Sequence, residues 1–265
     1  MTPPLFRVPA VPAVGQLVVL DGPEGRHAGS ALRVRPGERV RVGDGRGAVA
    51  DCRVSAAESG RVEAEVVARE DVLRPSPEVT VVQALPKSER SELAVELATE
   101  AGADRIVPWQ ADRCVSRWTG PKVDKGRTKW ENAARAAAKQ SRRAWEPEIG
   151  PLVDSAGLVA LVTEEVEAGA AALVLHEDGA VSFVEAVSAG PAGERILLVV
   201  GPEGGVSDAE IDALTQAGAR AVVLGPEVLR TSTAATVALG ALGVLTRRWS
   251  DPGTTLDPTE PPPRT

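Results

Sequence analysis

The sequence predicts an α/β protein in which a small β-rich domain precedes a larger domain built on a parallel sheet. Residues 5–72 contain short runs that alternate apolar and polar residues, separated by Gly and Asp turns. From Val79 onward, continuous apolar runs alternate with helix-like segments, which is typical of a parallel sheet covered on both faces. Residues 73–78 (LRPSPE) lie between the two parts, and their prolines cannot continue a sheet, so we expect a hinge there.

The elements follow from these patterns in chain order. In the first domain, a small β-barrel or sandwich, we expect strands at residues 16–20, 38–44, 48–54 and 61–67. In the second domain we expect strands at 79–85, 105–109, 171–177, 195–201 and 220–225. Helices are expected at 88–102, with Leu93 and Leu97 on one face, and at 124–144, about 207–218 and 233–248. The last helix is apolar nearly all round, which indicates burial in the core or against another subunit.

Composition places the chain among ordinary soluble proteins, with 43% hydrophobic and 25% charged residues. Prolines occupy the N-terminal region where a signal peptide would be apolar, and no run approaches the roughly 18 apolar residues of a membrane span. We therefore expect a cytoplasmic protein without a membrane partner. The two cysteines, Cys52 and Cys114, and the two histidines, His27 and His176, argue against a disulfide framework and against a protein-built metal site.

Basic charge is segregated, although the net charge is −7. Ten basic residues face two acids between Arg113 and Arg143, and six arginines face two acids between Arg26 and Arg46. Such segregation predicts a polyanion partner; the alternative is a solvated helix face beside arginine-rich strands. In the long helix, four cations at i, i+4, i+7 and i+8 would form one stripe: Arg135, Lys139, Arg142 and Arg143.

The first loop that can carry chemistry is Gly201–Gly205, which follows a buried strand. Its bare backbone lets a ligand approach closely and offers N–H donors, although a tight turn between strand and helix also favours glycine. Ser207 and Glu210 form a capping box that begins the next helix. No Lys-Ser/Thr pair follows, so this is not a P-loop.

A second loop runs from Gly225 to Thr231 and enters the last helix, with Thr231 or Ser232 as its N-cap. Arg230 would be costly to bury here unless it meets an anion or a carboxylate. Structural pairing and the binding of a substrate group therefore both remain open. Among the other candidates, His27 could contact phosphate or lie on the surface, His176 is interpreted as structural, and both cysteines as small buried side chains. Four tryptophans could stack on bases, but core packing is the favoured interpretation: Trp109, Trp118, Trp130 and Trp145.

Together these segments resemble a known family. HAGSALRVRPGE, KSERSELAVELATEAGADRIVPW, KWENAARAAAKQSRRAWEPEI, VGPEGGVSDAEI and LGPEVLRTSTAA are similar, in this order, to motifs of the RsmE methyltransferases in the SPOUT superfamily. That family methylates N3 of one uridine in 16S rRNA. The resemblance implies a PUA-like RNA-binding β-barrel at 1–72, a linker at 73–78 and a SPOUT domain with a trefoil knot at 79–250. Residues 251–265 are expected to be a disordered tail.

The resemblance also implies a homodimer, S-adenosylmethionine as cofactor, no metal, and 16S rRNA within the small ribosomal subunit as partner. The cofactor would be held mainly by the backbone of two loops, at Leu198, Val200, Gly201, Pro202, Glu203, Gly204, Gly205, Leu224, Gly225 and Leu229. Arg230, with Glu203 and Thr231, would be catalytic, Arg230 stabilising charge on a uracil oxygen. RNA would contact Arg26, His27, Arg33, Arg135, Lys139, Gln140, Arg142 and Arg143.

One departure concerns Ser232, which stands where the family commonly has glutamate. Serine cannot act as a carboxylate base, so we expect it to keep the N-cap role, and the proton acceptor stays open. Two alternatives remain beside the uridine methyltransferase. One is a knotted-fold RNA methyltransferase with another target nucleotide, and the other is a non-catalytic rRNA-binding assembly protein.

Overall fold

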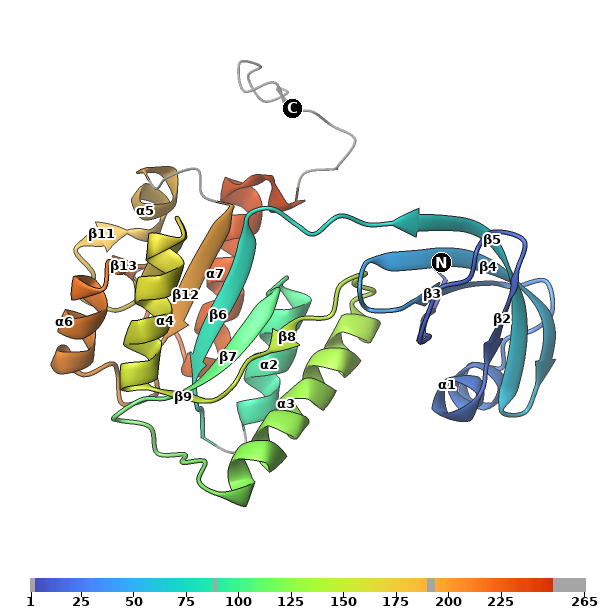
Figure 1. Cartoon of the computed structure of the whole chain (residues 1–265), viewed down its shortest axis with the longest axis horizontal. Coiled ribbons are helices and arrows are strands. Elements are labelled where there is room, and N and C mark those ends of the chain that lie inside the picture. Colours follow the sequence, from blue (N-terminus) through green and yellow to red (C-terminus); the bar gives the residue numbers. More distant parts are fainter. Residues whose placement is uncertain (1–2, 88–89, 190–193, 250–265) are drawn as a thin grey trace, which may run out of the picture.

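The computed structural model describes residues 3–87, 90–189 and 194–249, so the tail expected at 251–265 lies outside the described residues. Two domains lie side by side, and the chain crosses between them once, after the long strand that ends at Asp71 (Figure 1).

The N-terminal domain is a mixed five-stranded sheet in the order β1-β3-β4-β5-β2. Its elements are β1 (Leu5–Arg7), β2 (Leu17–Leu20), α1 (Gly22–Arg26), a π-helical turn (His27–Ala31), β3 (Arg39–Gly43), β4 (Ala48–Glu58) and β5 (Arg61–Asp71). β1 is parallel to β3 and the other pairs are antiparallel. β1 and β2 are the edge strands of this order, and no ladder joins them among the described residues. Register shifts at Asp51/Cys52 and Val54/Ala56 mark irregularities that bend the two long strands around an apolar core.

The C-terminal domain is built on an all-parallel sheet in the order β11-β13-β10-β12-β6-β7-β8, with β9 also paired to β7. Its strands are β6 (Glu78–Ala84), β7 (Arg105–Gln110), β8 (Glu148–Ile149), β9 (Val153–Asp154), β10 (Ala171–Leu175), β11 (Val181–Ser182), β12 (Arg195–Val200) and β13 (Arg220–Val223). The five long strands are those expected from apolar runs, because a central parallel strand is buried on both faces. Strand order does not describe a knot, so the trefoil knot stays a prediction.

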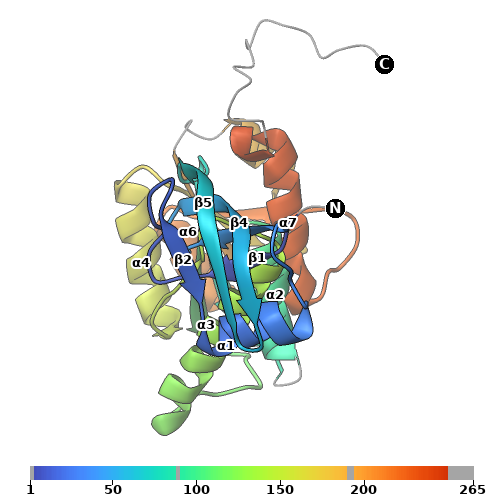
Figure 2. The ribbon, with the colours of Figure 1, turned by 90° about the vertical axis from the view of Figure 1, so that its right-hand side faces the viewer.

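Helices cover both faces of this sheet, and Figure 2 shows α4 and α7 on opposite sides. They are α2 (Ser91–Glu100), α3 (Pro121–Gln140), α4 (Ser155–Glu167), α5 (Phe183–Ala189), α6 (Asp208–Gln216) and α7 (Thr231–Leu245), followed by a 3₁₀ turn (Arg247–Trp249). α2, α3, α5 and α7 share one face, and α4 and α6 lie on the other.

Two expected helices differ in the structure. Ala94 and Val95 of α2 face the core while Leu93 is 41% exposed, so Leu93 does not mark the buried face. The helix expected at 124–144 is α3, which ends at Gln140. Its C-cap Ser141 donates a hydroxyl hydrogen bond to the Ala137 carbonyl at 2.7 Å, and Arg142 has a φ of 59°, which no helix can continue.

The two domains are braced by a short segment after α3. Residues 144–146 pair with the β3–β4 loop: the Gly47 N–H donates to the Ala144 carbonyl at 3.1 Å, and the Glu146 N–H to the Gly45 carbonyl at 2.9 Å. The indole N–H of Trp145 donates to the Val72 carbonyl at 2.9 Å. The Arg74 guanidinium lies 4.3 Å from the centroid of the same ring. These contacts hold the chain at Val72 and Arg74, where the linker begins, and the hinge at 73–78 stays a prediction.

Candidate functional site

A cavity with a volume of about 750 Å³ opens at the carboxyl ends of the parallel strands. Strands β10, β12 and β13 are neighbours in the sheet, so the loops that follow them meet at this edge. The cavity is lined by nearly all the residues predicted to bind a cofactor: Val200, Gly201, Pro202, Glu203, Gly204, Gly205, Leu224, Gly225 and Leu229. Leu198 is the exception, because it lies fully buried inside β12 and does not line the cavity.

The Gly201–Gly205 loop needs its glycines for different reasons. A Cβ at Gly201 would lie 2.7 Å from the Val206 side chain, and Gly205 has a φ of 74°. The carboxylate of Glu203 anchors the loop, because its Oε1 accepts a hydrogen bond from the Lys87 N–H at 3.1 Å. The predicted capping box is present: Ser207 caps the backbone of Glu210, and Glu210 caps Ser207 in return. The loop is therefore fixed at both ends, with its backbone facing the cavity.

Arg230 stands at the start of α7 and also lines the cavity. Its carbonyl accepts from the N–H groups of Thr233 and Ala234 at 2.9 and 3.0 Å, so Arg230 itself is the N-cap residue. The side chain is exposed, and no described residue forms an ion pair or hydrogen bond with its guanidinium. Structural pairing, the alternative left open by the sequence, is not observed within residues 3–87, 90–189 and 194–249.

The residues after Arg230 correct one expectation. Thr231 and Ser232 are buried inside the first turn of α7, and neither is the N-cap. The Thr231 carbonyl accepts a hydrogen bond from Nε2 of Gln83 at 3.2 Å, which ties this turn to β6. The Ser232 hydroxyl is buried without a hydrogen-bond partner among the described residues. The expectation that Ser232 caps the helix is therefore wrong, because the N-cap is Arg230, two residues earlier.

Sequence reasoning missed several residues that line the same cavity. Lys87 and Arg113 follow β6 and β7, and acidic residues enter from other loops: Glu177, Asp178, Asp208 and Glu227. Their position directly after parallel strands was the signal that could have found the first two. His176, interpreted as structural, also lines the cavity, and its Nδ1 accepts from the Asp178 N–H at 3.1 Å. The proton of a neutral His176 is then on Nε2.

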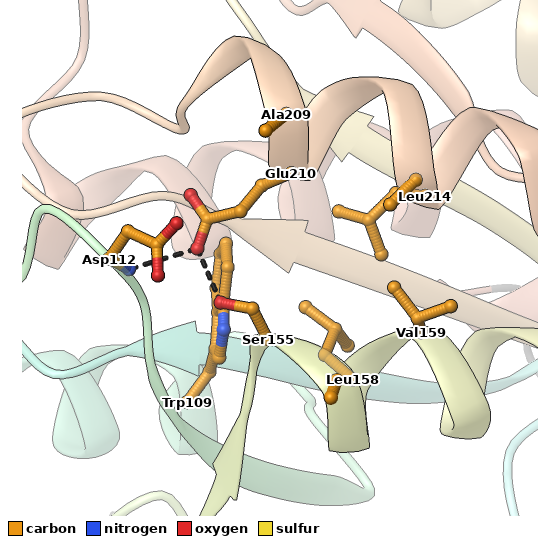
Figure 3. Close-up of a pocket in the computed structure, with 10 residues that line it drawn as sticks. Trp109, Asp112, Ser155, Leu158, Val159, Ala209, Glu210 and Leu214 are labelled. Carbon is orange, nitrogen blue, oxygen red and sulfur yellow. Dashed lines mark hydrogen bonds between the residues drawn. The ribbon is translucent and has the colours of Figure 1, made fainter.

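A smaller cavity of about 240 Å³ lies between α4 and α6 (Figure 3). At its polar end, the Glu210 carboxylate accepts from the Asp112 N–H at 2.9 Å and the Ser155 hydroxyl at 2.5 Å. It also accepts from the N–H and hydroxyl of Ser207, both at 2.9 Å. Glu210 is 4% exposed, and burial would raise its pKa, but the hydrogen bonds from Ser155, Asp112 and Ser207 prevail and lower it. Its oxygens are therefore engaged in joining three segments.

The predicted RNA-binding residues divide into two groups. Arg26, His27 and Arg33 are exposed on the N-terminal domain, and Gln140 is exposed at the end of α3. Arg135 is 62% exposed, and its guanidinium lies 3.7 Å from the Glu146 carboxylate. Lys139 is half-buried and pairs with Glu24 of α1 at 2.7 Å, so it joins the two domains.

Arg143 does not form part of an RNA-facing stripe. Its guanidinium donates to the carbonyls of Thr99 and Ala103 at 2.8 and 2.6 Å, and it lies 3.3 Å from the Asp104 carboxylate. The side chain is 13% exposed, and burial, opposed by Asp104, lowers its pKa to about 10. Because α3 has already ended, Arg142 and Arg143 do not share the helix face of Arg135. The stripe predicted from helical spacing is therefore wrong beyond Lys139.

The tryptophans and cysteines follow the core interpretation. Trp109 and Trp130 are fully buried, Trp118 packs edge-on against Trp130, and both cysteines are buried. Burial raises the pKa of the Cys52 thiol to about 11. Within the described residues, no cluster of His, Cys, Asp and Glu could hold a metal ion, and no helix has the length and apolar character needed to cross a membrane.

Comparisons with known proteins agree with this architecture. Residues 74–243 match the family described as RNA methyltransferase domain, and residues 20–67 match RNA methyltransferase PUA domain. A ribosomal RNA small subunit methyltransferase E from Mycobacterium tuberculosis is 56% identical over 92% of this chain and 93% of its own length. The Bacillus subtilis protein of the same name is 30% identical over 86% and 90%.

Two solved structures are similar over most of the chain. The ribosomal RNA small subunit methyltransferase E from Neisseria gonorrhoeae, bound to S-adenosyl methionine, has a TM-score of 0.79 and 28% identity, covering 92% of this chain and 98% of that one. A methyltransferase from Legionella pneumophila, in complex with the same cofactor, has a TM-score of 0.76 and 28% identity over the same shares.

Proposed function

The chain belongs to the ribosomal RNA small subunit methyltransferase E family, and we propose that it transfers a methyl group from S-adenosylmethionine to N3 of one uridine in 16S rRNA. The observation that carries this proposal is the cavity in which two backbone-rich loops meet beside the unpaired Arg230. The division into an RNA-binding domain at 1–72, a linker at 73–78 and a catalytic domain at 79–250 belongs to the same proposal. The family matches at 20–67 and 74–243 support that division.

The residues of the cavity fit the cofactor. A volume of about 750 Å³ is within the range of cavities that hold small ligands. S-adenosylmethionine carries a positive sulfonium and a positive amino group, and four carboxylates line the walls: Glu177, Asp178, Asp208 and Glu227. The loops at 201–205 and 224–229 would hold it through backbone groups. The cofactor, when bound, supplies the methyl group.

Arg230 would act on the uracil. N3 of uracil carries a proton at neutral pH, so its methylation requires that the proton leave and that negative charge on the ring be stabilised. A guanidinium that lines the cavity and has no protein partner among the described residues can donate hydrogen bonds to a carbonyl oxygen beside N3, where that charge develops. The α7 turn that begins at Arg230 fixes its backbone, so orientation also contributes.

Glu203 is the carboxylate that we propose as proton acceptor. Its Oε1 is held by the Lys87 N–H, which fixes the group within the cavity lining and leaves Oε2 available. Thr231 is buried, and we propose that it positions Arg230 through its carbonyl contact with Gln83. Ser232 also lines the cavity and its hydroxyl is buried without a hydrogen-bond partner among the described residues, but serine cannot act as a carboxylate base, so we do not propose it as the proton acceptor.

We further propose a homodimer formed through α7. Val237, Val244 and Leu245 of this helix are exposed, with Val244 at 76%, and Leu93 is exposed on α2, which packs beside it. An exposed apolar face of this kind indicates a protein contact. Sedimentation velocity should give the mass of a dimer, and V237K/V244K should give a monomer. A monomeric mass for the wild-type protein would contradict the dimer.

The test of function is nucleoside mass spectrometry after incubation of the protein, S-adenosylmethionine and small ribosomal subunits that lack the modification. New 3-methyluridine is expected, and a cytoplasmic location follows from that substrate. A different methylated nucleoside would favour the alternative of another target. Cofactor binding without any product would favour the non-catalytic assembly protein.

R230A should lower kcat by a factor of about 10²–10³, the effect of removing one donor that stabilises developing charge. The affinity for S-adenosylmethionine, measured by calorimetry, should change little. E203Q should also lose turnover, and its rate should lose the pH dependence contributed by a proton acceptor. Full turnover in either variant would remove that residue from the mechanism.

A further inference from the structure

We propose that four cations, two in the loop before α3 and two at the start of α3, bind phosphates of the RNA beside the target nucleotide. The basic strip consists of Arg113, Arg117, Lys122 and Lys125. The proposal rests on the proposed function and adds to it the path by which RNA reaches the cavity. It also replaces the RNA contacts expected from the far end of α3, where Lys139 and Arg143 are held in ion pairs.

The strip is continuous with the cavity. Arg113 follows β7 and lines the cavity, and its Nη1 lies 3.4 Å from the Gly204 carbonyl and 3.5 Å from that of Val206. From there the chain runs along the lower edge of the sheet to the first turn of α3 (Figure 1). Lys122 and Lys125 lie three residues apart in α3 and so project from one side of the helix. A strand of RNA whose target base enters the cavity would therefore meet these side chains next.

The loop that carries the strip is fixed by its own contacts. The Ser116 hydroxyl donates to the Pro86 carbonyl at 2.8 Å, and the Trp118 N–H donates to Oε1 of Gln110 at 2.8 Å. The Trp118 ring packs on Gly126 so closely that a Cβ there would lie 2.5 Å from it. Arg117 donates to the Asp112 carbonyl at 2.7 Å. The four cations are thus presented by an ordered loop and by the start of α3, which lowers the entropy lost on binding.

The strip also differs from the rest of the basic segment in its charge balance. All four side chains are exposed, and no carboxylate of the described residues forms an ion pair with any of them. Farther along α3, by contrast, Arg127 pairs with Glu131 at 3.2 Å and Lys129 with Glu92 at 3.1 Å. Unpaired exposed cations bind phosphate without first breaking an ion pair, and each such contact releases counterions from the RNA.

The experiment compares two double variants of equal charge, R117Q/K122Q in the strip and R127Q/K129Q outside it. Arg113 is left intact because its side chain also contacts the glycine loop at Gly204. Binding to small ribosomal subunits lacking the modification is measured between about 50 and 200 mM salt. Loss of two phosphate contacts should reduce the slope of log K against log salt by about 1.4, the value for single strands. R127Q/K129Q should keep the wild-type slope, and R117K/K122R should restore it.

Further readouts separate this proposal from folding and from the proposed function. R117Q/K122Q should raise KM for subunits and retain kcat, with unchanged affinity for S-adenosylmethionine. Thermal unfolding should change little, because Arg117 is exposed and loses a hydrogen bond to the Asp112 carbonyl that lies at the surface. If the two double variants have equal slopes of log K against log salt, the strip does not bind RNA phosphates, even if the wild-type protein makes 3-methyluridine. If R117Q/K122Q lowers the salt slope and R127Q/K129Q does not, but the wild-type protein makes no methylated product, the RNA contact of the strip is supported and the proposed function is overturned.

Discussion

At the scale of single residues, the burial of the Ser232 hydroxyl predicts how its removal affects stability and turnover. Its hydroxyl is buried without a hydrogen-bond partner among the described residues. Because an unsatisfied buried hydroxyl costs about 1–3 kcal/mol, S232A should unfold at the same or a higher urea concentration than the wild-type protein. Turnover of S232A should equal that of the wild type in the nucleoside assay. The matched change T233A, at a hydroxyl that donates to the Arg230 carbonyl at 3.2 Å, should instead lower stability. A large loss of turnover in S232A alone would restore Ser232 to the mechanism.

At the scale of elements, the start of α6 fixes the glycine loop. The Glu210 carboxylate accepts hydrogen bonds from the α6 cap, the loop after β7 and the start of α4. E210Q replaces acceptors with a donor that faces N–H groups, so the free energy of unfolding should fall by about 2–3 kcal/mol. Because the pKa of Glu210 is lowered in the folded protein, its contribution is complete above the ordinary value of 4.5 and is lost as pH falls through the lower folded value. The difference in free energy of unfolding between the wild-type protein and E210Q, measured by urea unfolding, should therefore be smaller near pH 4 than at pH 7. If this difference were the same at both pH values, the ionised Glu210 carboxylate would not be the group that stabilises the fold.

At the scale of the whole molecule, the domain brace should make the two domains unfold together. W145A removes the hydrogen bond to Val72 and the ring that packs against Gly47, so it should cost about 2–3 kcal/mol and separate the unfolding of the domains. Calorimetry should show one thermal transition in the wild-type protein and two in W145A. L73A provides the control in the same linker, because Leu73 is 85% exposed and should leave a single transition. One transition in W145A would show that other contacts couple the domains.

Much of this architecture could be predicted because it depends on local chemistry. Apolar runs gave the five long parallel strands, and the Ser207–Glu210 spacing gave the start of α6. The two loops that line the cavity could be located because glycine directly follows a buried apolar run in each, at Gly201 and at Gly225. These features need only neighbours in the chain, so sequence alone reveals them.

The misses depend on partners distant in the chain. Nothing local shows that Arg143 meets Asp104, or that Lys139 meets Glu24 in the other domain, so both were expected to face RNA. The end of α3 at Gln140 was also missed, because Arg142 adopts a left-handed conformation without glycine. The positions of Lys87 and Arg113 at the cavity emerged only when the sheet placed β6 next to β12 and β7 next to β6.

The length of α3 fixes the distance between the basic strip and the N-terminal domain. The helix has 20 residues, so about 30 Å separate its first turn, which carries the basic strip, from its last, which is fastened to the N-terminal domain. If RNA binds both the basic strip and the N-terminal domain, as proposed above, its two contact regions must therefore lie about 30 Å apart. A short oligonucleotide that carries the target uridine alone would reach one of these regions but not the other. Recognition of the substrate would then depend on the shape of the RNA as well as on its sequence.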